Sequence, residues 1–256
     1  MNTIDTEIPE LLFMKKYPAK LFYAGDTKLL KKIKISIVGT RKPSKYSRML
    51  TQTLASTLSK KGVCIVSGGA MGIDAIAHLG AKHNTISVLP CGVDIKYPAV
   101  NKSLLTDIEQ NALLLSQFDL GFKATPWSFV VRNELVVALG DILVVAEAEL
   151  GSGSMRSIEF ALKMGKEIFV FPQRIGESSA TNQLLKEGKA KAIYDIDEFC
   201  SQYGDTVVEN IVIDDFTQFC KTNPTYDEAL KRFPDKVFEA ELGGEIKIEN
   251  GMVILL

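Results

Sequence analysis

Two loops of small and polar residues carry groups suited to binding an anion, and each follows a short apolar run. In residues 39–46, Gly39 lets the backbone approach a ligand, Thr40 offers a hydroxyl, and Arg41 offers a planar fork that fits phosphate oxygens. In residues 67–74, consecutive small residues expose backbone N–H groups in a concave nest that suits an anion. For the first loop, an ordinary turn is the alternative.

The second loop lacks the Lys-Ser/Thr ending of a nucleotide-hydrolysing P-loop, and its glycines do not have the GxGxxG spacing. It therefore predicts phosphate contact without ATP hydrolysis. A third loop, residues 151–154, opens a predicted helix. Its Ser152 and Ser154 suit either a ligand contact or the cap of that helix.

Further along the chain, Phe129 precedes Arg132 and Asn133, which pairs an aromatic face with basic and polar side chains. Proteins that bind single strands combine aromatic platforms with basic grooves in this way. A core position on an apolar helix is the alternative for Phe129. Asp74 and His78 share one helical face, but no nucleophile pattern accompanies them, so we expect a packed histidine rather than an acid–base pair.

A repeated unit positions these loops from residue 33 onward: a β-branched apolar run, a Gly or Ser turn, then helical periodicity. The nearly continuous hydrophobicity of the runs predicts strands that are covered on both faces. The expected strands are 33–38, 63–67, 85–89, 112–116, 142–146 and 167–171, with helices near 46–60, 72–82, 101–110, 129–139, 154–164 and 181–188. The predicted fold is α/β, a Rossmann-like doubly wound parallel sheet, in which ligands gather beyond the carboxyl ends of the strands.

Two segments flank the predicted Rossmann-like domain, which covers residues 33–204. Residues 1–32 predict a short helical lead-in. Residues 205–256 predict a small winged-helix-like C-terminal domain, because three short helical segments precede two strand-like pieces joined by the hairpin signal Asn250-Gly251.

Charge is unevenly distributed, although the whole chain has a net charge of only −1. Residues 10–60 carry 12 Lys/Arg against two acidic residues, whereas residues 205–256 carry five Lys/Arg against 11 acidic residues. The two ends are therefore expected to meet different partners. For the lysines of residues 10–60, the alternative is that they form a solvated helix face and bind no partner.

The remaining composition narrows the class of protein. With 256 residues and 46% hydrophobic content, the chain can bury a full core. Its four cysteines lack metal-ligand or CxxC spacing and predict reduced core residues. No signal peptide or apolar span is seen, so we expect a cytoplasmic protein without membrane contact. We also expect neither a metal nor a cofactor.

Taken together, the motifs resemble the DNA-processing protein A family, also called DprA or Smf. Their order and spacing across residues 17–195 make the resemblance highly specific. The matching segments are IVGTRKPS at 37–44, SGGAMGID at 67–74 with Ala77-His78, VLPCGVD at 88–94 with Tyr97-Pro98, FVVRN at 129–133, VVAEA at 144–148, SGS at 152–154, and NQLL at 182–185 with Gly188.

This resemblance implies a non-enzymatic homodimer that binds single-stranded DNA, protects incoming DNA and helps load RecA recombinase during natural transformation. This chain departs from the family pattern at Glu134, where the family often has an arginine. The flank before Phe129 reads Thr125-Pro126-Trp127, so the nearest basic candidate on that side is Lys123. Phosphate contacts are implied for Thr40, Arg41, Ser67, Gly68, Gly69 and Ala70, a base contact for Phe129, and groove positions for Arg132, Asn133 and Asn182; Gly39, Lys123, Ser152, Gly153 and Ser154 complete the DNA-binding set.

Two other functions are considered. A Rossmann-like enzyme resembling nucleotide phosphoribohydrolases would need a PGGxGTxxE loop, and residues 149–154 lack the double glycine and a glutamate at the required spacing. Release of a free base would support that reading. A pure interaction scaffold is the third reading, against which the clustered Gly/Ser loops argue. The acidic C-terminal piece is predicted to contact protein, or duplex DNA weakly through Lys231, Arg232 and Lys247.

Overall fold

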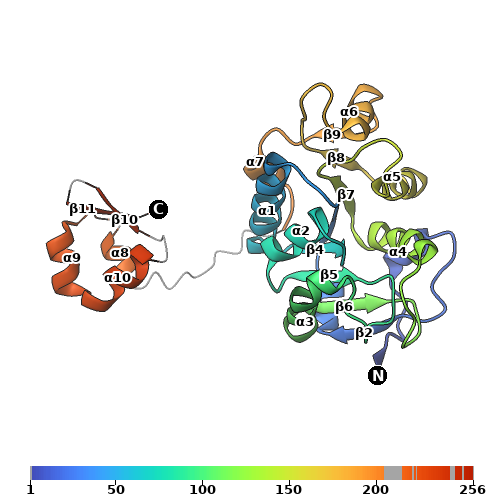
Figure 1. Ribbon diagram of the computed structural model, residues 1–256, viewed down its shortest axis with the longest axis horizontal. Helices are drawn as coiled ribbons and strands as arrows, with labels where there is room; N and C mark the ends of the chain where they lie inside the picture. The colour runs from blue at the N-terminus through green and yellow to red at the C-terminus, as the bar shows by residue number, and fades with distance from the viewer. Residues whose placement is uncertain are drawn as a thin grey trace. The chain divides into compact units, whose positions relative to one another are not determined.

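The computed structural model describes residues 2–204, 215–220, 222, 224–242, 246–249 and 251–255. The chain divides into two units, Met1–Val207 and Val208–Leu256 (Figure 1). Within the described ranges, no helix is long and apolar enough to cross a membrane.

A nine-stranded sheet forms the first unit, in the order β1-β2-β6-β5-β4-β3-β7-β8-β9. Neighbouring strands from β6 to β9 run parallel, while β1 and β2 add an antiparallel edge. The strands are β1 (Asn2–Thr3), β2 (Phe22–Gly25), β3 (Lys34–Val38), β4 (Cys64–Gly68), β5 (Thr85–Val88), β6 (Leu113–Ser116), β7 (Ile142–Val145), β8 (Ile168–Val170) and β9 (Lys191–Ala192). This order confirms the predicted doubly wound sheet, because the chain winds outward from β3 to β6 and then returns to β7.

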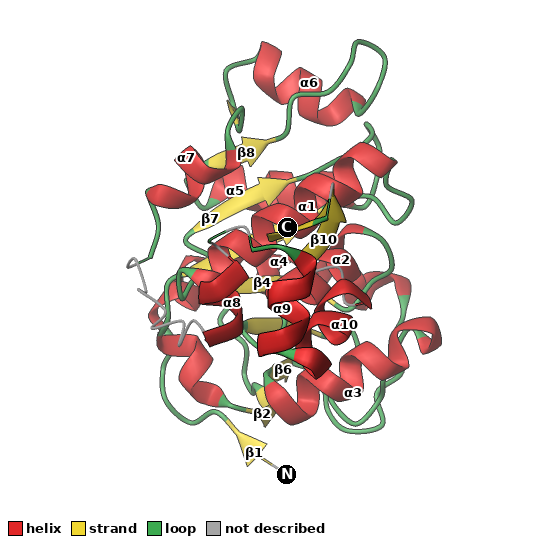
Figure 2. Cartoon of the chain, turned by 90° about the vertical axis from the view of Figure 1, so that its left-hand side faces the viewer, coloured by secondary structure: helices red, strands yellow, loops and turns green. Residues whose placement is uncertain are grey.

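Helices cover both faces of this sheet. Residues of α1, α2 and α7 pack on one face with Ile35 and Ile37, and residues of α4, α5 and α6 pack in the other apolar cluster (Figure 1). The helices are α1 (Lys45–Lys60), α2 (Ile73–Ala81), α3 (Lys102–Asn111), α4 (Pro126–Leu139), α5 (Ser154–Lys163), α6 (Ser179–Lys186) and α7 (Ile196–Ser201). In the turned view of Figure 2, β8, β7, β4, β6 and β2 follow one another across the unit.

The lead-in before β3 joins the sheet. It contains two 3₁₀-helices, η1 (Pro9–Phe13) and η2 (Thr27–Lys31), as its predicted helical character suggests, but it also supplies β2. Strand β2 pairs antiparallel with β6, from Phe22 opposite Ser116 to Gly25 opposite Leu113. The sequence of β2, FYAG, contains no β-branched residue and ends in glycine, so it gives no strand signal, and its pairing with the edge of β6 decides its conformation.

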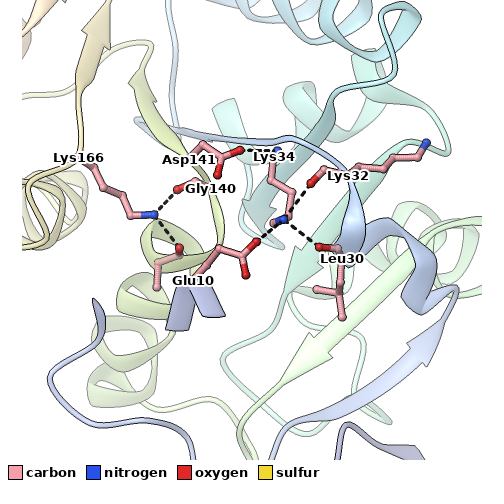
Figure 3. A network of polar contacts seen from close by, with 8 residues as sticks. Glu10, Leu30, Lys32, Lys34, Gly140, Asp141 and Lys166 are labelled. Carbon is pink, nitrogen blue, oxygen red and sulfur yellow. Dashed lines mark hydrogen bonds and ion pairs between the residues drawn. The ribbon is translucent and has the colours of Figure 1, made fainter. Parts of the chain in front are cut away.

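Polar contacts secure the amino ends of β3 and β7 (Figure 3). The buried Lys34 ammonium pairs with Glu10 Oε1 at 2.6 Å and donates to the carbonyls of Leu30 and Lys32, at 2.9 Å each. The Lys34 backbone N–H donates to Asp141 Oδ2 at 3.0 Å. The network thus ties the lead-in to the start of two central strands.

A second lysine completes this region. Lys166 Nζ, on the turn after α5, donates to the carbonyl oxygens of Ala138, at 2.7 Å, and of Gly140 (Figure 3). Partial burial lowers the pKa of Lys166, an effect that Asp141 and Glu10 oppose. These bonds satisfy carbonyls at the end of α4 that have no partner inside that helix.

The cysteines agree with their sequence interpretation. Cys64, Cys91, Cys200 and Cys220 are all buried and form no disulfide. Burial raises the pKa of the Cys64 and Cys200 thiols to about 12. They therefore remain protonated core residues at neutral pH.

Among its described residues, the second unit has three helices followed by a hairpin, in the predicted order. These are α8 (Asp215–Cys220), α9 (Tyr226–Arg232), α10 (Pro234–Leu242), β10 (Ile246–Glu249) and β11 (Met252–Leu255). Thr225 caps α9, since its Oγ1 accepts from the Glu228 N–H while Glu228 Oε2 accepts from the Thr225 N–H. Asn250 of the predicted turn lies outside the described residues, and the winged-helix identity stays a prediction.

Candidate nucleic-acid interface

A pocket of about 800 Å³ lies beyond the carboxyl ends of β3 and β4. The loop after β7 and the first turns of α4 and α5 complete its walls. Most of the sequence-predicted site residues line it: Gly39, Thr40, Arg41, Gly68, Ala70, Phe129, Arg132, Asn133, Ser152, Gly153 and Ser154. The topology therefore assembles groups from four separate segments at one edge of the sheet, as expected for a doubly wound fold.

The first two loops interlock. Thr40 N–H donates to the Glu147 carbonyl at 2.8 Å, and the Thr40 carbonyl accepts from Ile73 N–H at 3.1 Å. Gly72 has φ +81°, and a Cβ there would lie 2.4 Å from the Thr40 carbonyl oxygen. Only glycine suits this contact, which positions the exposed Arg41 at the pocket.

Arg132 forms the floor of the pocket, with its side chain only 5% exposed. Its Nη1 lies 3.6 Å from Asp74 Oδ2 and donates to the Val88 carbonyl at 3.4 Å. A Cβ on Gly68 would lie 1.2 Å from the same Nη1, so Gly68 makes room for the guanidinium. Burial lowers the pKa of Arg132 and Asp74 raises it, and the group remains charged.

Asp74 is the acidic partner of Arg132 and also lines the pocket. Burial raises the pKa of its carboxyl, while the Arg132 charge is the largest influence in the opposite direction. Removing either partner would leave the other charge buried and unpaired, which is costly. The pair is therefore built to hold Arg132 in one orientation.

Phe129 stands at the pocket wall, half-buried. The Arg41 and Arg132 guanidinium carbons lie 5.3 Å and 5.9 Å from its ring centroid, within cation–π range. Tyr97, 44% exposed, meets the same ring edge-to-face at 6.0 Å. The wall thus presents two aromatic rings beside two positive charges.

The third loop does not cap its helix. The N-cap of α5 is Gly153, and it makes no side-chain cap hydrogen bond. Among the described residues, four buried side-chain polar atoms have no hydrogen-bond partner: Ser87 Oγ, Thr125 Oγ1, Arg132 Nε and Ser152 Oγ. Three of these residues line the pocket. Because unpaired buried polar groups are rare, their concentration here indicates a place for a polar ligand.

The charges that line the pocket are mainly positive. Arg41, Lys42, Arg132 and Arg156 contribute to its lining, against the single carboxylate of Asp74. Arg156 is exposed and also pairs with Glu159 at 2.8 Å. This positive excess suits phosphate oxygens.

Two predicted phosphate contacts, Ser67 and Gly69, are not part of the pocket lining. Ser67 is fully buried, and its hydroxyl donates to the Ile37 carbonyl at 2.6 Å. A Cβ on Gly69 would meet Leu89 at 3.1 Å and Leu105 at 3.2 Å, because this residue packs against the core. A ligand contact by either residue stays a prediction.

Lys123 and Asn182 also lie outside the lining. Lys123 is exposed in the loop before α4, next to Ala124, which does line the pocket. The Asn182 side-chain amide donates to the carbonyls of Arg174 and Glu177, at 3.0 Å and 2.8 Å. Asn182 thus closes a turn in the loop after β8.

Lys42, Tyr97 and Arg156 also line the pocket, although they are not among the residues predicted from the sequence. Lys42 lies in the first loop, and Tyr97 follows β5, whose carboxyl end meets the same edge of the sheet. The rule that ligands gather at strand ends would have identified both. Arg156 becomes part of the lining only through the direction of α5.

His78 confirms the expectation of a packed histidine. It is buried, with Nε2 2.8 Å from the Gly68 carbonyl oxygen and Nδ1 2.7 Å from Thr85 Oγ1. Burial lowers its pKa to about 4. A carbonyl only accepts, so the neutral ring carries its proton on Nε2. No cluster of His, Cys, Asp or Glu suited to a metal occurs among the described residues.

Glu134, the departure from the family pattern, has a structural role. Its Oε1 accepts from the Lys15 backbone N–H at 2.9 Å. This contact joins α4 to the lead-in, on a part of the helix that does not line the pocket.

Comparison with known proteins shows which family this chain matches. A sequence model described as "DNA recombination-mediator protein A" matches residues 1–204. The DNA processing protein DprA of Streptococcus pneumoniae is 37% identical over 176 residues, which cover 67% of this chain and 62% of that protein. DprA of Bacillus subtilis is 34% identical over 208 residues, covering 77% of this chain and 70% of the relative.

Solved structures agree with these relatives. DNA processing protein A from Helicobacter pylori, described for its single-stranded DNA binding mode, is 43% identical with a TM-score of 0.77, over 78% of this chain and 94% of that one. The X-ray structure of DprA from Streptococcus pneumoniae is 34% identical with a TM-score of 0.71, over 76% of this chain and 70% of that one.

Proposed function

We propose the following function for this chain, which belongs to the DNA recombination-mediator protein A family. It binds single-stranded DNA without reading its sequence. Phosphates contact the first two loops, and a base stacks on Phe129. The observation that carries this proposal is the meeting of Arg41, Arg132 and Phe129 in one cationic pocket.

Phosphate binding rests chiefly on Arg41. This residue is exposed, and the loop that holds it is fixed by the contacts of Thr40 and Gly72. Lys42 and Arg156 add positive charge, while the half-buried Ala70 adds a small residue to the lining. Such contacts neutralise phosphates and make the affinity depend on salt.

Base binding rests on Phe129. Stacking on an aromatic ring tolerates every base, because every base has a π-face. Arg132 is buried beneath the pocket, so we assign it to holding the ring and the local charge rather than to reaching out for a phosphate. Asn133 and the unpaired hydroxyl of Ser152 offer hydrogen bonds to the strand.

The wider role is drawn from the family. We propose a cytoplasmic homodimer that protects incoming DNA and helps load RecA recombinase during natural transformation, without catalysis. The Helicobacter pylori relative is described as binding single-stranded DNA, which supports the same class of ligand here.

The C-terminal unit is proposed to contact protein, or duplex DNA only weakly. Two of its cations are already engaged: Lys247 pairs with Glu249 at 2.6 Å, and the Arg232 guanidinium lies 4.9 Å from the Phe219 ring centroid. Together with the negative charge of residues 205–256, this leaves little positive surface for phosphates.

The test is a titration of a labelled single-stranded oligonucleotide at several salt concentrations, with a duplex of the same sequence for comparison. Arg41→Ala should bind about tenfold more weakly and reduce the slope of log affinity against log salt by about 0.7, since one phosphate contact is lost. Arg48→Ala is the matched control, because Arg48 is an exposed arginine on α1 that does not line the pocket.

Equal loss of affinity in the two variants would contradict a specific role for Arg41. Absence of any preference for the single strand would contradict the proposed function itself. In that case, release of a free base from nucleotide monophosphates should be assayed, because it would support the phosphoribohydrolase alternative.

A further inference from the structure

One exposed aromatic ring at the rim of the pocket takes no part in the contacts proposed above. Trp127 lies in the first turn of α4 and is 55% exposed, although tryptophan is usually well buried. Thr125 and Pro126, just before it, line the pocket, and so does Val130, three residues later on the same helical face. Trp127 therefore borders the pocket.

Two phenylalanine rings fix the orientation of the indole. Phe118 and Phe122 meet Trp127 edge-to-face, with centroids 5.5 Å and 5.7 Å away and interplanar angles of 76° and 68°. These two rings stack on each other at 4.7 Å, and Phe118 is buried. A ring that is already held in place loses little conformational entropy when a ligand stacks on it.

We propose that Trp127 is a second base-stacking platform, which takes a nucleobase of single-stranded DNA where the strand leaves the pocket. The inference rests on the proposed function. Phe129 lies two residues further along the helix and is turned by about 200° relative to Trp127, so the two rings take different bases. A hydrophobic protein partner is the other occupant of an exposed indole, and the positive charge of the adjoining pocket favours the nucleobase.

Trp127 is the single tryptophan of the chain, so intrinsic fluorescence reports on this position alone. Unlabelled oligothymidylate, titrated into the full chain, should quench the emission and saturate in parallel with binding measured by anisotropy on a labelled oligonucleotide. An oligonucleotide of equal length with abasic positions carries the same phosphates but offers no base there. It should leave the emission unchanged.

Variants add a second readout. Trp127→Ala should weaken binding about tenfold, the size of one lost base stack, whereas Trp127→Phe keeps an aromatic face and should lose much less. The salt slope should stay the same in both variants, because neither removes a charge. If Trp127→Ala does not fold, quenching in the unmodified chain decides.

Tight binding with unchanged emission and an unaffected Trp127→Ala variant would overturn the platform and leave the proposed function intact. Equal quenching by the abasic oligonucleotide would also overturn it, because the signal would then arise without stacking. Absence of binding to either oligonucleotide would overturn the proposed function, and the platform with it.

Discussion

The two ends of the central strands differ in whether their polar groups are paired. At the amino ends of β3 and β7, the buried Lys34 has an ion pair with Glu10 and two carbonyl acceptors. At the carboxyl ends, Arg132 keeps an unpaired Nε, and Arg41 has no ion pair within the described residues. A saturated network holds a fold together, whereas unsaturated groups around an open pocket remain available to a ligand.

The largest effect on folding stability is expected when Lys34 is replaced. Lys34→Met should lower the free energy of unfolding by about 3–5 kcal/mol, because it leaves Glu10 and two carbonyls without their partner. Denaturant titration measures this loss. Lys31→Met, an exposed lysine in the same segment, should change stability by less than about 0.5 kcal/mol. DNA affinity of the folded Lys34→Met protein should be unchanged, and a selective loss of that affinity would contradict the separation of the two ends.

His78 connects the saturated interior to the pocket through the Gly68 carbonyl. Its pKa of about 4 lies below the ordinary value of 6.5, so between these values the unfolded chain binds more protons than the folded one. Stability contributed by neutral His78 is therefore complete above pH 6.5 and should fall by about 3 kcal/mol as the pH drops to 4. Unfolding curves at several pH values, compared with those of His78→Gln, isolate this contribution. An identical pH dependence in the two proteins would contradict it.

Gly68→Ala tests whether the position of Arg132 organises the pocket. The added Cβ would lie 1.2 Å from Arg132 Nη1, so the guanidinium must move and Phe129 loses its support. We expect a destabilisation of about 1–3 kcal/mol and a clear loss of DNA affinity. Gly153→Ala is the control, because that glycine also lines the pocket but a Cβ there meets nothing within 4 Å. If both variants bind equally well, Arg132 does not organise the pocket.

The smallest effect is expected at Arg156. Its ion pair with Glu159 is exposed, and such pairs contribute about 0–1 kcal/mol. Arg156→Ala should therefore leave the unfolding curve nearly unchanged and weaken DNA binding only about twofold, with a slightly smaller salt slope. A loss of stability above about 1 kcal/mol would show that this side of the pocket is structural.

Much of the fold follows from local sequence. The β-branched runs identify β3 to β8 to within one or two residues at their ends, because buried parallel strands need continuous apolar side chains. Strand β2 is different, since its four residues become a strand only by pairing with β6. Residues 67–70 show the same limit at the site. Their glycines mark a turn, but they do not reveal that Ser67 points into the core.

The amino-acid sequence was enough to predict the doubly wound sheet, the strand-end loops and the residue types able to hold a phosphate, because these depend on local periodicity and on glycine at particular turns. The tertiary structure was needed to show that Arg132 pairs with Asp74 within cation–π distance of Phe129, that Tyr97 joins the wall, and that Trp127 stays exposed at the rim. The contacts of Arg132 with Asp74 and of Tyr97 with Phe129 join segments far apart in the chain. The direction of each side chain depends on how α4 packs across the sheet, which no local pattern encodes.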